Sequence, residues 1–347
     1  MPRLQPSVTY VLPIRSSVPR LDADFRDYLG YIAGLTEVVV VDGSSVPVFE
    51  EHARTWGRNV LHIRPHADLA TPMGKVGGVL TGMRVASNSR IIIADDDIRY
   101  DEDGIAAVAN ALDNADVVRP QNYFSPRPWH ALWDSGRILL NRISGGDWPG
   151  TLGVQRERVM LAGGYDGTAM FENLELVRTV LASGGRECLL LDTFVARRPS
   201  TTRHFLSQRV RQAYDEFARP ARLLVQLALL PIAIIAFIVG GWHPLGYASA
   251  AIIALAEIGR RRGSGANVFP FTASLIAPAW VIERAICAWL ALGARVFLGG
   301  VPYRGAILRK AATPLSELRA RVNAVPQDLV GLAENLDVDG LEGSIVR

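Results

Sequence analysis

Three consecutive carboxylates, Asp95 to Asp97, directly follow the apolar segment Ile91 to Ala94. Adjacent like charges at the end of a buried strand repel one another and lose solvation, so we expect a cation to compensate them. Side chains alternate along a strand, which places Asp95 and Asp97 on one side and Asp96 on the other. Carboxylates two residues apart at a strand end are suitable ligands for hard cations. We therefore predict that Asp95 and Asp97 bind Mn²⁺ or Mg²⁺.

Two other interpretations of this segment depend on the residues that follow it. A calcium-binding loop is disfavoured, because Arg99 stands where a third oxygen ligand is needed and the required glycine is absent. A solvated acidic turn is the alternative, since Asp101 to Asp103 form a good N-terminus for a helix. The Asp-x-Asp pattern is short, and its position after four apolar residues favours the metal site.

The first two hundred residues alternate between strand and helix patterns. Strand-like runs cover 8–14, 37–42, 59–63, 91–95 and 116–121, and helix-like segments cover 22–34, 46–56, 74–88 and 101–113. The strand-like runs are continuously apolar, as in strands covered by helices on both faces. This order predicts an α/β fold with a mainly parallel, Rossmann-like sheet that binds ligands at the carboxyl ends of its strands. Asp42 and the three carboxylates stand at such strand ends.

Composition limits the classes of protein that fit this chain. Its 347 residues are enough for about two domains, and a net charge of +3 gives little support for nucleic-acid binding. Cys188 and Cys287 are too far apart for a disulfide framework or a zinc motif, which fits a reducing compartment. We therefore expect a protein of a reducing compartment that has no nucleic-acid partner.

Apolar residues are concentrated between positions 220 and 300, and we expect this region to associate with a membrane. Residues 221–242 hold one charged residue, Arg222, and as a helix would extend about 33 Å, enough to cross a bilayer core. Residues 245–259 would complete a spanning hairpin with both ends cytoplasmic, because the turn between the two segments lacks Lys and Arg. Residues 268–298 contain charges, and we expect either a third membrane helix or, with preference, an interfacial helix.

These patterns divide the chain into three parts. Residues 1–219 form the α/β domain, 220–300 the membrane helices and 301–347 a cytoplasmic tail. The excess of arginine before the first apolar segment places the α/β domain on the cytoplasmic side of a multi-pass cell-membrane protein. A soluble core of hydrophobic helices is the alternative, and it is weakest for 221–242.

Six segments follow one another in an informative order, namely VVVVDGSS, MGKVGGVLTGMRVAS, IIIADDDI, TLGVQRERVMLAGGYDGTAMFENLEL, QRVRQ and VPYRGAILR. With the first 215 or so residues they resemble family 2 glycosyltransferases of the GT-A fold. The last two segments resemble that family's Q/R-x-x-R-W and W-R-G-R elements. They point to the branch that includes ceramide and hopanoid glycosyltransferases.

The resemblance implies roles for individual residues. Asp42 would contact the base or ribose of a nucleotide, and Lys75 would lie near its phosphates; the alternative for Lys75 is an ordinary surface charge. Gln208 and Arg211 would add hydrogen bonds to the diphosphate, or Arg211 would instead contact lipid headgroups. The full expected nucleotide-sugar-binding set is Pro13, Asp42, Lys75, Asp95, Asp96, Gln208 and Arg211.

Two positions depart from the family pattern. Its acceptor motif usually ends in Glu-Asp, with the Asp as base on the attacking hydroxyl, whereas this chain has Glu172 and Asn173. A neutral amide cannot accept that proton, so Glu172 and Glu175, which share a helix face, are the candidate substitutes; the alternative is that both only favour the helix. Gln212 stands where the motif has Trp, which favours single-sugar transfer over polymerisation.

From these features we expect a metal-dependent hexosyltransferase. It would move one sugar from a nucleotide-diphosphate sugar to a lipid or polyprenyl-phosphate acceptor at the cytoplasmic membrane face, with inversion, as the resemblance implies. A catalytically impaired nucleotide-sugar-binding scaffold protein at the membrane is the alternative that Asn173 motivates. A nucleotidyltransferase lacks support, because the segment LPIRSSVPR contains no glycine for a phosphate loop.

Overall fold

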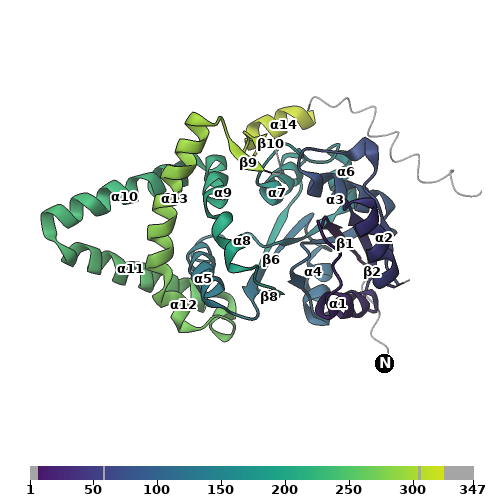
Figure 1. Cartoon of the computed structure of the whole chain (residues 1–347), viewed down its shortest axis with the longest axis horizontal. Helices are drawn as coiled ribbons and strands as arrows, with labels where there is room; N and C mark the ends of the chain where they lie inside the picture. The colour runs from purple at the N-terminus through teal and green to yellow at the C-terminus, as the bar shows by residue number, and fades with distance from the viewer. Residues whose placement is uncertain (1–6, 58, 304–305, 324–347) are drawn as a thin grey trace, which may run out of the picture.

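The computed structural model describes residues 7–57, 59–303 and 306–323. One large sheet contains β1 (Thr9–Ile14), β2 (Glu37–Asp42), β3 (Leu61–Ile63), β4 (Arg90–Ala94), β5 (Ile98–Arg99), β6 (Val117–Phe124), β7 (Thr151–Gln155) and β8 (Glu187–Arg197). Their order across the sheet is β3-β2-β1-β4-β7-β6-β8-β5. Helices pack on both faces of this sheet (Figure 1).

The sheet is mixed rather than mainly parallel. Strands β3, β2, β1 and β4 are mutually parallel, as predicted, but β7 runs antiparallel to both β4 and β6, and β5 runs antiparallel to β8. The register pairs Ala94 with Thr151, so the carboxyl end of β4 meets the amino end of β7. The loop before β7 consequently lies against the carboxylates, and Asp95 N donates to Gly150 O at 2.8 Å.

The helices of the first half agree with the sequence pattern. They are α1 (Ala23–Ala33), α2 (Val46–Thr55), α3 (Gly74–Val85) and α4 (Glu102–Ala111), followed by α6 (Arg156–Leu161) and α7 (Glu172–Ala182), with the 3₁₀ turn η1 (Ala67–Leu69). Asp22 and Asp101 cap α1 and α4 by accepting from backbone N–H groups. The cap at Asp101 accounts for the acidic helix start but not for the three carboxylates before it.

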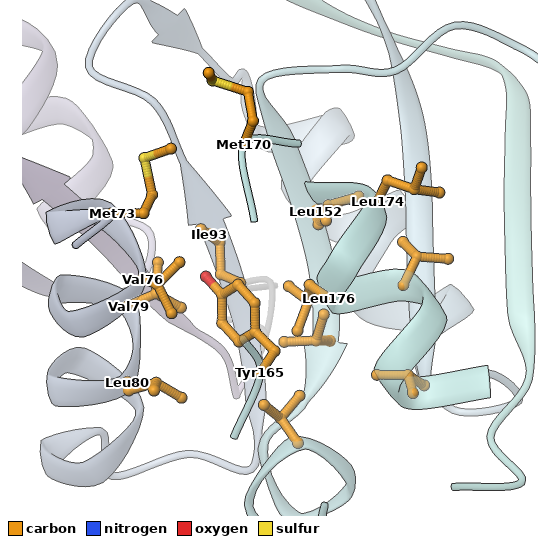
Figure 2. Close-up of a cluster of buried hydrophobic side chains, with 14 of the residues drawn as sticks. Met73, Val76, Val79, Leu80, Ile93, Leu152, Tyr165, Met170, Leu174 and Leu176 are labelled. Atoms are coloured by element: carbon orange, nitrogen blue, oxygen red, sulfur yellow. The ribbon is translucent and has the colours of Figure 1, made fainter. Parts of the chain in front are cut away.

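Alternate strand residues divide between two cores. Tyr10 and Leu12 face α1 and α4, whereas Val11 and Ile93 face α3 and α7. Figure 2 shows α3 and α7 on either side of Tyr165, with side chains from both helices directed toward it. This shared core holds the N-termini of α3 and α7 at the same edge of the sheet.

The remaining elements are mainly helical. They are α5 (Trp129–Asn141), which lies between β6 and β7, and, after β8, α8 (Thr202–Ser207), α9 (Arg209–Tyr214), η2 (Asp215–Ala218), α10 (Pro220–Gly240), α11 (Trp242–Arg261), η3 (Arg262–Asn267), α12 (Phe271–Leu275), α13 (Ala277–Phe297), β9 (Val301–Tyr303), β10 (Ala306–Leu308) and α14 (Leu315–Asn323). Helices α10 and α11 meet at Gly241 (φ 62°) and extend away from the sheet as a hairpin, with α13 across its open end (Figure 1). Cys287 and Ala291 of α13 belong to the same core as α3 and α7.

Within the described residues, α10 is the one helix long and apolar enough to cross a membrane, and 11% of its apolar stretch is buried. A single such helix is weak evidence for a span. The first predicted segment, 221–242, therefore has some support, whereas the partner 245–259 and the segment 268–298 do not meet the same criterion. In the predicted tail, α14 packs against α7 and β9 contacts α13, whereas 324–347, with Arg304 and Gly305 of the VPYRGAILR segment, lie outside the described residues.

Candidate active site

The three carboxylates occupy the tight turn between β4 and β5. Arg197, the last residue of β8, joins two of them: its Nε donates to Asp97 Oδ2 at 2.9 Å, and its Nη2 lies 3.6 Å from Asp95 Oδ2. Asp96 instead pairs with Arg20. Asp95 and Asp97 thus lie together and Asp96 apart, as side-chain alternation predicted.

Lys75, in the first turn of α3, is the second cation at this turn. Its Nζ lies 2.6 Å from Asp95 Oδ1 and 2.8 Å from Glu172 Oε1. Burial disfavours the ammonium charge, but the two carboxylates raise the pKa of Lys75 well above its usual value. Lys75 therefore ties the end of β4 to the start of α7.

Asp95 and Asp97 differ in their ionisation. Burial opposes the charge of Asp95, but Lys75 and Arg197 hold its pKa below the usual value. Burial raises the pKa of Asp97, with the neighbouring carboxylates adding to the effect and Arg197 opposing it. Oδ1 of Asp97 is buried without a hydrogen-bond partner. Of the four carboxylate oxygens of Asp95 and Asp97, Asp97 Oδ1 is therefore the one without a cationic partner in the described part of the chain.

The donor set fits a hard divalent cation. Two carboxylates separated by one residue offer oxygen ligands, and the unpartnered Asp97 Oδ1 is a buried acceptor that a cation would satisfy. Lys75 and Arg197 engage both oxygens of Asp95, and Arg197 also engages Oδ2 of Asp97. The unpartnered Asp97 Oδ1 is therefore the acceptor that best suits a hard cation such as Mn²⁺ or Mg²⁺.

A pocket of about 340 Å³ lies beside this turn, at the carboxyl ends of β1 and β2. Pro13, Lys75, Asp95 and Asp96 line it, which places four of the predicted nucleotide-sugar-binding residues around one cavity. A Cβ on Gly78 would lie 3.0 Å from Cβ of Pro13, so glycine at this position allows α3 to pack closely against β1. The volume lies in the range of small-ligand sites.

Asp42 does not face this pocket. Its carboxylate is fully buried and accepts hydrogen bonds from His52 Nδ1 at 2.7 Å, His62 Nε2 at 3.1 Å and Ser44 N at 2.9 Å. Burial opposes ionisation, but these hydrogen bonds hold the pKa of Asp42 well below its usual value. Asp42 therefore holds β2, β3 and α2 together. Its buried carboxylate is not positioned to contact a base or ribose, contrary to the prediction.

Asp42, His52 and His62 are also close enough together to suggest a metal site. The backbone N–H of Arg20 donates to His52 Nε2 at 2.8 Å, and both histidines donate to Asp42. Hydrogen bonds at these distances account for the cluster without a metal ion.

The acceptor-side residues have separate roles. Glu172 pairs with Lys75, whereas Glu175 is fully buried and accepts from Thr313 N at 2.6 Å and Thr313 Oγ1 at 2.5 Å. Both oxygens of Glu175 are therefore occupied, and it anchors the segment after β10 to α7. Its predicted role as a substitute base is wrong in this geometry, because its carboxylate bonds Thr313 rather than lining a pocket.

Asn173 supports the loop beside the carboxylates. Its Nδ2 donates to Pro149 O at 2.9 Å, next to the Gly150 carbonyl that bonds Asp95. We predict that Asn173→Asp lowers turnover by about tenfold, since a carboxylate cannot donate this bond and adds repulsion near Asp95. Asn173→Ala should lower turnover less, because it adds no charge. A gain of activity in Asn173→Asp, measured as product formed per minute, would contradict this role.

Gln208 is the N-cap residue of α9 and Arg211 lies within this helix, beside the carboxylate turn. Arg211 Nη1 donates to Gln208 Oε1 at 3.0 Å and its Nε to Met170 Sδ at 3.1 Å. The charge of Arg211 helps to hold the pKa of Asp95 low. Gln208 borders a small pocket with Asp97 and Arg197. Arg211 thus lies close enough to act on Asp95, and Gln208 lies in a pocket that Asp97 also lines.

Four further residues that the sequence did not single out surround the same centre: Arg197, Asp215, Arg219 and Arg284. Arg197 reaches the carboxylates because β8 pairs with β6, a pairing that no local pattern specifies. Arg284 could have been identified from the sequence, because it is a charged residue inside an apolar helix and such residues often mark functional sites.

Asp215 is a buried carboxyl group with Oδ1 unpartnered, and burial raises its pKa to about 7. Its pKa in the unfolded chain is about 3.9, so the folded state holds a proton that the unfolded state has lost between about pH 4 and 7. Stability from this group therefore falls as the pH rises through that window. We predict that Asp215→Asn raises the free energy of unfolding by about 2–4 kcal/mol at pH 8 and by little at pH 4. Thermal melts across this range test it, and parallel curves for the two proteins would contradict it.

Comparison with known proteins gives structural likeness only. No protein-family model and no curated protein sequence matches the chain. The mannosyltransferase PcManGT from Pyrobaculum calidifontis, solved with GDP-Man and Mn²⁺, is 18% identical over 82% of this chain and 87% of its own, with a TM-score of 0.47. Glucosyl-3-phosphoglycerate synthase from M. tuberculosis is 13% identical over 56% and 73%, with a TM-score of 0.36. Mannosyl-3-phosphoglycerate synthase from Rubrobacter xylanophilus is 13% identical over 58% and 70%, with a TM-score of 0.38.

Proposed function

We propose that the chain is a GT-A-type glycosyltransferase that moves one sugar from a nucleotide-diphosphate sugar. The observation that carries the proposal is the pair Asp95 and Asp97, with an unpartnered buried oxygen, at the edge of a pocket formed by strand carboxyl ends. A diphosphate needs its charge neutralised as it leaves, and Lys75 and Arg197 lie at this pair of carboxylates to contribute to that neutralisation.

The chain's own residues divide the work. Pro13 and Asp96 border the cavity for the nucleoside, and Lys75 and Arg211 supply positive charge beside the diphosphate. When bound by Asp95 and Asp97, Mn²⁺ or Mg²⁺ acts as a Lewis acid on the leaving diphosphate. Asn173 holds the loop that carries the Gly150 carbonyl against Asp95.

The acceptor in this proposal is a lipid or a polyprenyl phosphate. Helix α10 is long, apolar and mostly exposed, and together with α11 and α13 it would hold the protein at the cytoplasmic face of the cell membrane. Residues 1–219 form the catalytic part, 220–300 the membrane part and 301–347 the tail. Single-sugar transfer with inversion, as in the ceramide and hopanoid branch, completes the proposal.

A catalytically impaired scaffold that only binds nucleotide sugars is the second candidate. It is favoured by the absence of a free base on α7, where Asn173 is an amide and Glu172 pairs with Lys75. It predicts nucleotide-sugar binding without any labelled lipid product.

Thermal stabilisation by a panel of nucleoside diphosphates, with and without Mn²⁺, tests the proposal. A ligand at 100 times its dissociation constant contributes about 2.7 kcal/mol, which a melting curve resolves easily. We expect one base to stabilise the protein and to do so mainly when Mn²⁺ is present. Equal melting curves for all nucleotides, with and without Mn²⁺, would reject nucleotide-sugar transfer.

A further inference from the structure

Arg197 borders a second cavity, of about 140 Å³, between α5, η2 and α13. Its lining includes Arg137, Arg197, Arg219, Arg222 and Arg284, and we call it the arginine pocket. Arg197 connects it directly to Asp95 and Asp97. A group bound in the arginine pocket therefore lies next to the expected metal and diphosphate.

The positive charge of this pocket is only partly compensated. Arg137 is paired with Asp134 and Asp147, but Arg219 and Arg222 share one carboxylate oxygen of Glu216, at 2.8 and 3.3 Å. Arg284 is 3% exposed and forms no ion pair among the described residues. Its Nε and Nη1 and the Nε of Arg219 are buried donors without a hydrogen-bond partner. Buried N–H groups of arginine are rarely left unsatisfied, so these donors indicate an anionic ligand.

The carboxyl groups in the wall do not cancel this charge. Oε1 of Glu216 is shared between two guanidinium groups, and its Oε2 is buried without a hydrogen-bond partner. Burial raises the pKa of Asp215 to about 7, so Asp215 is only partly ionised at neutral pH. Arg219, Arg222 and Arg284 thus face two carboxyl groups in the pocket lining, and the pocket favours an anion.

An apolar groove continues from the arginine pocket. This groove, of about 430 Å³, lies between α10, α13 and the end of α5, and Asn141, Arg222, Trp280 and Arg284 border both cavities. Beyond the shared arginines its walls are mainly apolar, with Leu140, Val225, Leu229 and Val281. The cavity pair therefore presents positive charge beside the carboxylates and apolar surface along the candidate membrane helix.

We propose that this pair of cavities binds a lipid phosphate monoester, with its phosphate in the arginine pocket and its chain in the groove between α10 and α13. Resting on the proposed function, this phosphate is the acceptor of the sugar. The charge of the arginine pocket favours a phosphate over a neutral lipid alcohol as the headgroup.

A phosphate acceptor also explains why α7 offers no free base. The second pKa of a phosphate monoester is about 6, so its oxygen is already ionised at neutral pH. That oxygen attacks the anomeric carbon, the bond from this carbon to the diphosphate oxygen breaks, and the electron pair leaves with the nucleoside diphosphate. No proton is transferred, so the amide at Asn173 and the paired Glu172 are compatible with turnover.

Binding of farnesyl phosphate, farnesol and inorganic phosphate to the full chain in neutral detergent tests the proposal. We expect farnesyl phosphate to bind at least about tenfold more tightly than either of the others, because only it engages both cavities. Arg222→Gln should weaken farnesyl phosphate about tenfold and leave the stabilisation by nucleoside diphosphate and Mn²⁺ unchanged; Arg222 is 43% exposed, so this variant should fold. Arg284→Gln should do the same, and Arg261→Gln, at the exposed end of α11, should change neither.

Three results would overturn the proposal. If farnesol binds as tightly as farnesyl phosphate, the arginine pocket does not bind phosphate. If phosphatidylglycerol competes with farnesyl phosphate equally well, the cavities bind bilayer lipids in general rather than a lipid phosphate monoester. Loss of nucleotide binding in Arg222→Gln, with farnesyl phosphate unaffected, would assign the arginines to the donor. A failure of the proposed glycosyltransferase function would give a different result. The wild type would then bind farnesyl phosphate but no nucleotide, and the lipid phosphate would no longer be assigned as the acceptor.

Discussion

Asp97→Asn is expected to lower sugar transfer by about 100-fold or more and to abolish the dependence of nucleotide binding on Mn²⁺. Asp97 carries the buried oxygen without a partner, and an amide at this position weakens a hard-cation site while leaving the shape of the turn unchanged. Labelled-sugar transfer and thermal stabilisation by nucleoside diphosphate, each with and without Mn²⁺, measure both effects.

The melting temperature separates this loss from unfolding. Asp97→Asn removes one of three adjacent carboxylates, so the variant without ligand should melt within a few degrees of the wild type. Asp113→Asn is a matched control, because Asp113 forms a surface ion pair with Arg90. Its transfer rate should be unchanged. Wild-type transfer rates in Asp97→Asn would remove Asp97 from the metal site.

Lys75→Met is expected to destabilise the fold as well as the site. Without the ammonium group, Asp95 and Glu172 remain near each other with no cation between them. Removing one partner of a largely buried ion pair costs about 2–3 kcal/mol here, since the group is still partly exposed. Melting curves should show a lower midpoint, and nucleotide stabilisation should fall because the phosphate contact is also lost.

The pH dependence of this loss has a definite sign. In the wild type the depressed pKa of Asp95 contributes stability above its unfolded value of about 3.9, and this contribution is lost as the pH falls below that value through the lower folded pKa. In Lys75→Met the support is absent, so the difference from the wild type should be largest near neutral pH and should shrink as the pH falls below about 4. Lys310→Met, which removes the chain's other lysine and a more exposed pair with Asp166, should cost less than about 1 kcal/mol. Equal losses in both variants would contradict the special role of Lys75.

The local parts of the site could be predicted because they depend on neighbouring residues. The apolar run before Asp95 predicted a strand that ends at the carboxylates, and the helix-like segment 74–88 placed Lys75 at a helix start. Pro13, Lys75, Asp95 and Asp96 accordingly line one cavity.

The remainder depends on contacts between distant segments. Antiparallel β7 and the long strand β8 were missed, and with them Arg197, because strand order across a sheet is set by tertiary packing. Asp42 was expected at the ligand, but the histidines that bury it belong to α2 and β3. Glu175 was expected as a base, but Thr313, 138 residues later, occupies its carboxylate.

A structure of the full chain with Mn²⁺ and the most stabilising nucleoside diphosphate tests the central claim most directly. The account predicts the cation within about 2.1 Å of a carboxylate oxygen of Asp97 or Asp95, with diphosphate oxygens as further ligands. The nucleoside should occupy the cavity beside Pro13. A cation bound instead by Asp42, His52 and His62, or a nucleotide bound away from the carboxylate turn, would contradict it.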